Sequence, residues 1–153
     1  MVSVRRILCP IDFSDYSRAA LAEAEAVAVR FDAELIVAHV VEPVLYPVAY
    51  GLPIADAGFN LEEESRTGAQ KALTPVVDEI VARGVNAKTL VTTGTAALKI
   101  CDLVEENDVD LVVISTHGLT GVKHALLGST AERVVRRCKA PVLTVKAAES
   151  DVD

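Results

Sequence analysis

The hydrophobic residues of the chain follow two different periods. Short uninterrupted runs of Val, Ile, Leu and Ala predict β-strands that are covered on both faces, which are typical of a parallel sheet. Four runs are strong and a fifth, at residues 88–91, is weaker; the strong runs occupy residues 6–10, 35–41, 111–114 and 142–145. Between the runs, apolar residues recur at spacings of three and four, which predicts amphipathic helices.

Two helices are predicted in the first half of the chain. The first follows Ser14, a suitable N-cap, and its apolar positions extend to Phe31. The second has apolar positions at residues 69–81 and ends at Gly84, which we expect to form a left-handed C-cap. Pro75 lies inside this pattern, so either a kink or a late start of the helix is expected.

Two further helices are predicted in the second half. One has apolar positions at residues 97–104 and ends near Asn107. The other begins at Ser129, where the sequence Ser-Thr-Ala-Glu has the form of a capping box, and extends to about Cys138. The resulting βαβαβαβαβ order predicts an α/β fold, a Rossmann-like three-layer sandwich. We expect a five-stranded parallel sheet of order 3-2-1-4-5 with four helices on its two faces.

The predicted domain spans residues 1–147 and contains one long irregular stretch. Residues 42–60 include three prolines and two glycines, which predicts a flexible loop. A loop of this length is either a lid or binding loop, or a mobile insertion, and both alternatives stand. Residues 148–153 are expected to form a frayed tail.

Composition and charge exclude several classes of function. The chain has 153 residues, of which 22 are acidic and 15 basic, so its formal net charge is −7. Nucleic-acid-binding and membrane-surface proteins use clustered Lys and Arg to neutralise phosphate, so neither partner is expected. No apolar run reaches the roughly 18 residues that span a bilayer, and the N-terminal residues lack the order of a secretory signal. These features predict a cytoplasmic protein.

The cysteines and histidines argue against a metal site made by the protein alone. Cys9, Cys101 and Cys138 are odd in number, far apart and set in apolar segments, which predicts reduced buried thiols rather than disulfides. No pair has C-x-x-C spacing, and no two histidines have the i, i+4 spacing of a helical metal pair. His39, at the end of a predicted strand, is expected to be a hydrogen-bonded core histidine.

The ends of the first and fourth predicted strands carry the candidate chemistry. Open α/β sheets bind ligands outside the carboxyl ends of their strands, at the point where the strand order reverses. The first strand leads into Asp12, and the fourth leads into a loop that reaches a helix at Ser129; the loop contains Gly118, Gly121 and Gly128. Glycines adopt backbone angles closed to other residues and let amide N–H groups approach a ligand, and a helix start adds unpaired donors. The loop therefore predicts a site for an anion, most naturally phosphate.

A structural alternative exists for the same loop, in which the glycines only turn the chain and Ser129 only caps the helix. Two familiar phosphate motifs, G-x-x-x-x-G-K-[ST] and G-x-G-x-x-G, are absent from the sequence. The lysine and paired magnesium carboxylate that support rapid hydrolysis of nucleoside triphosphates are therefore missing.

The sequence resembles the universal stress protein family over nearly its whole length. The resemblance rests on residues 7–14, 38–40, the end of the third strand at Gly94, residues 115–130 and residues 140–145. Family members that bind ATP share a G-x2-G-x9-G-[ST] pattern. Here the second and third glycines are Gly118 and Gly128, and Ser129 follows, whereas Ser115 replaces the first glycine. Its side chain either narrows the pocket or offers a hydroxyl to the ribose.

The resemblance implies an adenine nucleotide, ATP or its products ADP and AMP, and assigns residues to its parts. Pro10 and Ile11 would line the base and ribose end beside Asp12, and the backbone of Val40 would read the adenine edge. The phosphate-binding residues would be Gly118, Gly128, Ser129 and Thr130. A Mg²⁺ or Mn²⁺ ion would bind through the phosphates and water.

Two residues near the expected ligand, His117 and Asp12, have alternative roles. His117 in the loop either contacts the ligand or ties the loop down. Asp12 either binds the ribose hydroxyls or caps the first helix.

The last predicted strand, Val142–Val145, lies at an edge of the expected sheet, where an exposed apolar strand needs a partner. The family pairs these strands across a two-fold axis, so the resemblance implies a homodimer. It further implies a nucleotide-dependent regulator of the stress response, with an unknown protein partner and at most slow ATP hydrolysis. One alternative is a nucleotide-free dimeric interaction module. Another is a nucleotide-dependent enzyme, which would need an acceptor site that the sequence does not supply.

Overall fold

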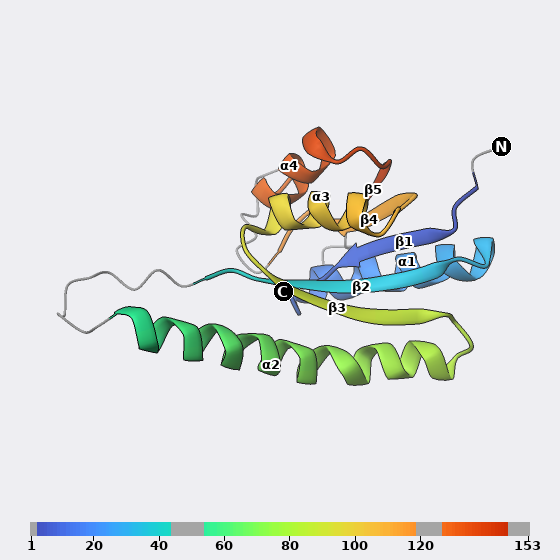
Figure 1. The fold of residues 1–153 in the computed structure, drawn as a ribbon. Helices are drawn as coiled ribbons and strands as arrows, with labels where there is room; N and C mark the ends of the chain where they lie inside the picture. The colour runs from blue at the N-terminus through green and yellow to red at the C-terminus, as the bar shows by residue number, and fades with distance from the viewer. Residues whose placement is uncertain (1–2, 44–53, 119–126, 147–153) are drawn as a thin grey trace, which may run out of the picture.

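The computed structural model describes residues 3–43, 54–118 and 127–146. Strands and helices alternate along the chain (Figure 1). The strands are β1 (Arg6–Pro10), β2 (Glu34–Val41), β3 (Ala87–Thr93), β4 (Leu111–Ser115) and β5 (Val142–Val145). The helices are α1 (Asp15–Phe31), α2 (Ile54–Ala82), α3 (Ala96–Glu106) and α4 (Ser129–Arg137). Every predicted strand and helix is confirmed in its predicted order.

The five strands form one parallel sheet of order β3-β2-β1-β4-β5, as predicted. The strand order reverses at β1, which pairs with β2 on one side and with β4 on the other. The register with β2 joins Pro10 to Ala38 at the end of the strand. The register with β4 joins Leu8 to Val112, and β4 then continues beside β5 as far as Ser115 and Val145.

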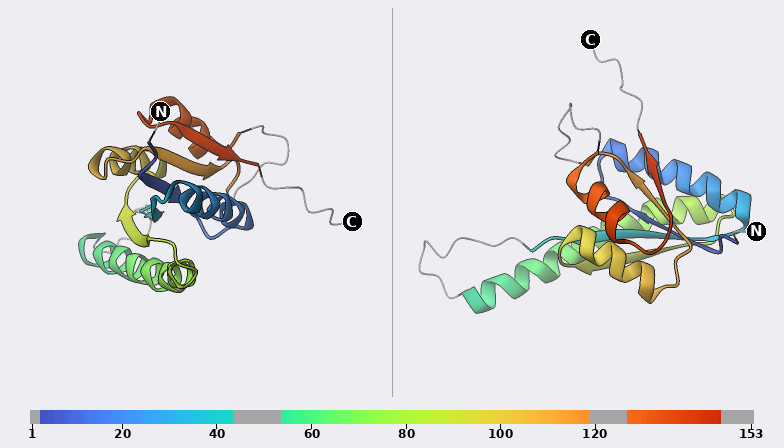
Figure 2. Two further views of the ribbon diagram at one scale, coloured as in Figure 1. Left: turned by 90° about the vertical axis from the view of Figure 1, so that its right-hand side faces the viewer. Right: turned by 90° about the horizontal axis from the view of Figure 1, so that it is seen from above.

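Two helices cover each face of the sheet (Figure 2). The core beneath α1 and α2 includes Ile7 and Cys9 of β1, whereas the core beneath α3 and α4 includes Leu8. Successive side chains of a strand point to opposite faces, so β1 is buried on both sides. This double burial is why the predicted strands are continuous apolar runs rather than alternating ones.

The helix ends follow the predicted signals at three places and differ at one. Ser14 caps α1, because its Oγ accepts a hydrogen bond from Ser17 N–H. Gly84 has a φ of 91°, in the left-handed region expected after α2. Asn107 follows the last residue of α3.

The capping box predicted at Ser129 is wrong. The N-cap of α4 is Gly128, in an extended conformation, and Ser129 is the first helical residue. The carboxylate that the capping box would have used belongs to Glu132, and it pairs instead with Arg136 one turn later, at 2.9 Å.

The predicted loop over residues 42–60 is wrong for its last part, because α2 begins at Ile54; residues 44–53 of that prediction lie outside the described residues. The late start expected from Pro75 is also wrong, since the proline lies inside the helix. Good helix formers such as Glu62–Glu64 continue α2 where its side chains face solvent. Hydrophobic periodicity cannot detect such a segment. Figure 1 shows the first turns of α2 extending past the end of β3.

The prediction of three reduced thiols is correct only for Cys9, which is a fully buried free cysteine. Cys101 and Cys138 form a disulfide, with their Cα atoms 4.9 Å apart. Packing of α3 against α4 brings together two residues that are 37 positions apart, and linear spacing does not show such packing. Among the helices described here, none combines the length and apolarity that a membrane crossing requires.

Candidate functional site

The chain segments that follow β1 and β4 meet at the carboxyl edge of the sheet. A Cβ atom added to Gly118, just beyond β4, would lie 2.5 Å from Oδ2 of Asp12, just beyond β1. The two segments are therefore in direct contact at the point where the strand order reverses. Ligands of open α/β sheets bind at this kind of position.

The start of α4 reaches the same place. Gly128 N–H donates a hydrogen bond to the carbonyl oxygen of Thr116, at 2.6 Å, so the two ends of the glycine loop are joined. Thr116 N–H in turn donates to the carbonyl oxygen of Val145 on β5, at 3.0 Å. Thr116 is buried and links β5, the loop and α4, a role that sequence reasoning missed. A threonine after a buried strand has no sequence feature that predicts such a role. Only the neighbouring residues of the glycine motif indicated this part of the chain.

Space, rather than unusual backbone angles, explains the glycine at position 128. Its φ is −68°, which other residues adopt freely, so the expectation of special backbone angles is wrong there. A Cβ atom at this position would lie 2.9 Å from the backbone oxygen of Thr116. Glycine is required because the backbones of the loop and the helix start approach so closely. Gly121 lies outside the described residues.

Asp12 is half-buried and belongs to a small network at the start of α1. Its Oδ1 accepts a hydrogen bond from Ser14 N–H at 3.0 Å, and its own N–H donates to Ser17 Oγ at 3.3 Å. The helix cap itself is Ser14, so the alternative in which Asp12 caps α1 is not what the structure shows. Oδ2 is the carboxylate oxygen that faces Gly118.

His39 on β2 holds the loop that carries Asp12. Its Nδ1 lies 2.7 Å from the carbonyl oxygen of Ile11, and its ring packs 4.8 Å from the ring of Phe13. The prediction of a hydrogen-bonded histidine is confirmed, although the residue is half-buried rather than part of the core. Phe13 has a φ of 64°, a backbone conformation that is unfavourable for a residue with a large side chain. The surrounding contacts must therefore maintain it. The position of Asp12 thus depends on β2 as well as on β1.

Ser115 and His117 make contacts within their own loop. The hydroxyl of Ser115 donates a hydrogen bond to the carbonyl oxygen of His117, at 2.7 Å. Nδ1 of His117 lies 3.0 Å from Thr116 Oγ1, and its ring lies 5.8 Å from that of Tyr16 on α1. These contacts tie the loop to itself and to α1.

The N-terminus of α4 differs electrostatically from the N-termini of α1 and α3. Ser14 caps α1 with its hydroxyl, and the carboxylate of Glu42 accepts a hydrogen bond from Ala96 N–H at the start of α3, at 3.1 Å. At α4 the N-cap is Gly128, which has no side chain to offer. Since no side chain among the described residues caps this end, its first amides are candidates to bind an anion, helped by the helix dipole.

The remaining predicted residues lie on or next to β1, β2 and α4. Pro10 and Ile11 are buried at the end of β1, and Ile11 N–H donates to the carbonyl oxygen of Ala38 on β2. Val40 follows on β2 and is half-buried. Ser129, which is exposed, and Thr130 form the first turn of α4. The arrangement offers one carboxylate, hydroxyls and helix-start amides, a set suited to a ligand with both hydroxyl groups and negative charge.

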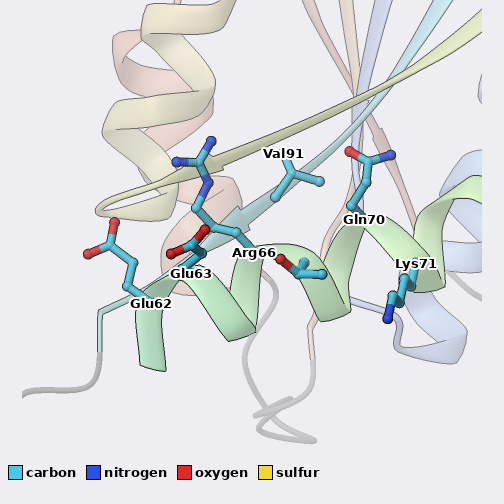
Figure 3. Close-up of a pocket in the computed structure, with 7 residues that line it drawn as sticks. Glu62, Glu63, Arg66, Gln70, Lys71 and Val91 are labelled. Atoms are coloured by element: carbon cyan, nitrogen blue, oxygen red, sulfur yellow. The ribbon is translucent and has the colours of Figure 1, made fainter. Parts of the chain in front are cut away.

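In the described part of the chain, no three His, Cys, Asp or Glu residues gather in a position to hold a metal ion. A shallow cavity of about 720 Å³ lies elsewhere, between α2 and β3 (Figure 3). Its lining residues are Val91 and, on α2, Glu62, Glu63, Arg66, Thr67, Gln70 and Lys71. Two acidic and two basic side chains leave this surface without net charge. It shares no residue with the predicted site.

Comparison with known proteins agrees with the fold and covers almost the whole chain. A family model described as the universal stress protein family matches residues 3–146. Universal stress protein MJ0531 of Methanocaldococcus jannaschii is 36% identical over 142 residues, which are 93% of this chain and 82% of that protein. The solved structure of hypothetical protein MJ0577 matches with a TM-score of 0.86 at 27% identity, over 97% of this chain and 100% of that one.

Two further solved structures share the fold at lower identity and contain nucleotides. A universal stress protein in complex with cAMP has a TM-score of 0.68 at 24% identity, over 95% of this chain and 99% of that one. The universal stress protein from Archaeoglobus fulgidus in complex with dAMP has a TM-score of 0.59 at 20% identity, over 95% of this chain and 100% of that one.

Proposed function

Because the chain belongs to the universal stress protein family, we propose that it is a regulatory protein that binds ATP, ADP or AMP where β1, β4 and α4 meet. The observation that carries this proposal is the contact of the segment after β1 with the two ends of the loop between β4 and α4. Gly118 lies against Asp12, and Gly128 lies against Thr116, so a carboxylate and a helix N-terminus with a glycine N-cap are brought to one place. An adenine nucleotide needs both features, a partner for its ribose hydroxyls and donors for its phosphates.

Each part of the nucleotide has a candidate partner. Asp12 would accept hydrogen bonds from the ribose, beside Pro10 and Ile11, and the backbone of Val40 would read the adenine edge. The phosphate partners would be Gly118, Gly128, Ser129 and Thr130, with Ser115 and His117 shaping the loop beneath them. Backbone amides carry no net charge, so a chain of net charge −7 can bind a polyanion without a basic patch.

The proposal treats a Mg²⁺ or Mn²⁺ ion as a ligand of the bound phosphates, since such ions keep several waters and take few protein ligands. It assigns the protein at most slow ATP hydrolysis and a cytoplasmic role in the stress response, through a protein partner still to be identified. The relatives in complex with cAMP and dAMP support an adenine nucleotide as the ligand class.

Two measurements test the proposal. Purified protein is denatured, and released small molecules are identified by mass spectrometry; an adenine nucleotide at near one per chain is expected. Calorimetric titration with ATP, ADP, AMP and cAMP then ranks the ligands, with GTP as the control for base recognition. Absence of released nucleotide together with no heat of binding for any of the four would contradict the proposal and favour a nucleotide-free interaction module.

We also propose a homodimer that pairs β5 of one protomer with β5 of its partner. β5 is an edge strand of the sheet, and its Leu143 is 41% exposed. Pairing of two such edges would cover the side of β5 that faces away from β4, and an exposed strand edge otherwise invites aggregation.

A further inference from the structure

The disulfide between Cys101 and Cys138 joins the two helices on one face of the sheet. Cys101 lies in the middle of α3, and Cys138 is the C-cap of α4. Their Cα atoms are 4.9 Å apart, a separation at which the bond forms without backbone movement. Both residues are half-buried, in contrast to the fully buried Cys9.

Within the described residues, α4 is held by two buried side chains and by the hydrogen bond from Gly128 N–H to Thr116 at its start. The helix has nine residues, of which Ala131 and Val134 are buried, and an isolated helix of this length is unstable in water. An ion pair at 3.1 Å joins Lys139, the residue after Cys138, to Glu105 of α3. Their side chains are 76% and 58% exposed, so this pair contributes little. The disulfide therefore adds a covalent constraint to the packing of α4 against α3.

The opposite end of α4 is the proposed phosphate site. A helix of nine residues is about 13 Å long and moves as a rigid body. A constraint at Cys138 thus restricts the position of Gly128 and of the amides that follow it. Restricting these donors before the ligand arrives lowers the entropy lost on binding.

We propose that Cys101 and Cys138 form a reversible dithiol–disulfide site, and that its oxidised state tightens nucleotide binding by fixing α4. The second half of this inference rests on the proposed function. Disulfides of proteins in reducing compartments are mostly transient, catalytic or redox-sensing, which fits a bond between two half-buried residues.

The reaction requires a disulfide RSSR as its oxidant, such as glutathione disulfide. One cysteine thiolate attacks RSSR, forms a mixed disulfide and releases RS⁻. The second cysteine thiolate then attacks the sulfur of the first, closes the bond between Cys101 and Cys138 and releases the second RS⁻. The two thiol protons end on the two RS⁻, so RSSR is reduced to two RSH while the cysteine pair loses two electrons.

Cys9 provides an internal control for this chemistry. It is completely buried in the core, and burial raises the pKa of its thiol to about 12. The thiolate is the reactive form of cysteine, so Cys9 remains unmodified in the folded protein.

Thiol trapping tests the site itself. The full chain is equilibrated across ratios of glutathione to glutathione disulfide, alkylated with iodoacetamide and analysed by peptide mass spectrometry. We expect no adducts at oxidising ratios, adducts on Cys101 and Cys138 at reducing ratios, full reversal between them, and an adduct on Cys9 only after denaturation. The same adduct pattern at every ratio, whether two adducts or none, would overturn the proposal.

Thermal unfolding and ATP calorimetry test the coupling, in oxidised protein, reduced protein and the variants Cys101→Ser and Cys138→Ser. The oxidised protein should have a Tm about 5–10 °C above the reduced protein and bind ATP about five-fold more tightly. Each variant should behave like reduced protein under both conditions. Equal ATP affinity in both states would overturn the coupling. If neither state binds ATP while trapping gives the expected pattern, the proposed function fails and the redox site stands.

Discussion

Oδ2 of Asp12 occupies the space that a side chain at Gly118 would need, with 2.5 Å between that oxygen and the position of the missing Cβ. The two residues are 106 positions apart in sequence, and they come into contact because β1 and β4 are neighbours in the sheet. A glycine of the loop therefore determines where the carboxylate lies. This relationship makes the role of Asp12 testable without changing Asp12 itself.

Gly118→Ala should displace the carboxylate of Asp12 and weaken ATP binding. The side chain of Asp12 can rotate away from the added methyl group, so the fold should persist with a small change in Tm. We expect the affinity for ATP to fall about tenfold, which corresponds to about 1.4 kcal/mol. Calorimetry with ATP and with 2′,3′-dideoxy-ATP measures the effect.

The pair of ligands separates loss of the ribose contact from general damage. In the natural protein, dideoxy-ATP should bind more weakly than ATP, because it lacks the hydroxyls that Asp12 would bind. In the variant this preference should largely disappear. A preference for ATP that is unchanged in Gly118→Ala would show that Asp12 does not bind the ribose.

Gly128→Ala should be more damaging, because the added methyl group would meet backbone rather than a side chain. The added Cβ atom would lie 2.9 Å from the carbonyl oxygen of Thr116, which also accepts the hydrogen bond from Gly128 N–H. Neither group can rotate away, so the loop and the start of α4 must move apart. We expect a loss of about 1–3 kcal/mol in stability, measured by urea unfolding, together with weaker ATP binding.

Gly68→Ala is the matched control for this substitution. Gly68 lies in the exposed part of α2, and nothing lies within 4 Å of an added Cβ. Alanine favours the helix there, so stability should rise by up to about 1 kcal/mol with no change in ATP affinity. Equal stability of Gly128→Ala and Gly68→Ala would contradict the close approach of Gly128 to Thr116.

The sequence predicted the strands and the sheet order because a doubly covered strand leaves a solid apolar run, as in β1. It indicated a candidate site because a loop between a strand and a helix can be read from glycine positions. It could not show the disulfide between Cys101 and Cys138 or the role of Thr116, since both depend on how distant segments pack. The start of α2 was missed for a related reason: its exposed turns need no apolar face, so they leave no periodic signal.

Glu25 of α1 and Arg83 after α2 should make stability depend on pH in the acidic range. Nε and one terminal nitrogen of Arg83 donate to the two carboxylate oxygens of Glu25, at 2.6 Å and 2.8 Å. These hydrogen bonds, with the charge of Arg83, lower the pKa of Glu25 from its usual 4.5. A carboxylate with a lowered pKa stabilises the folded state fully above the unfolded value and loses this effect as pH falls through the folded value.

Comparison of the natural protein with Glu25→Gln measures this contribution. At pH 7 the variant should have a Tm lower by about 1–3 °C, because bidentate pairs at the surface are of modest strength. The difference should shrink as pH falls below about 4.5 and disappear once Glu25 is protonated in both states. Glu23→Gln, which removes a carboxylate at an exposed neighbouring position of α1, controls for the change in net charge. A Tm difference that is constant between pH 7 and pH 3 would contradict the assignment.

Leu143→Glu should separate the proposed dimer into monomers. Leu143 is exposed on β5, so two-fold pairing of β5 strands would place the introduced carboxylates of two protomers close together in an apolar interface. Repulsion and the cost of burying these charges would oppose assembly.

Sedimentation velocity at micromolar concentration should show a dimer for the natural protein and a monomer for the variant, with the same helical signal in circular dichroism. Val29→Glu, at an exposed position of α1, should remain dimeric. A natural protein that sediments as a monomer would rule out the β5 interface.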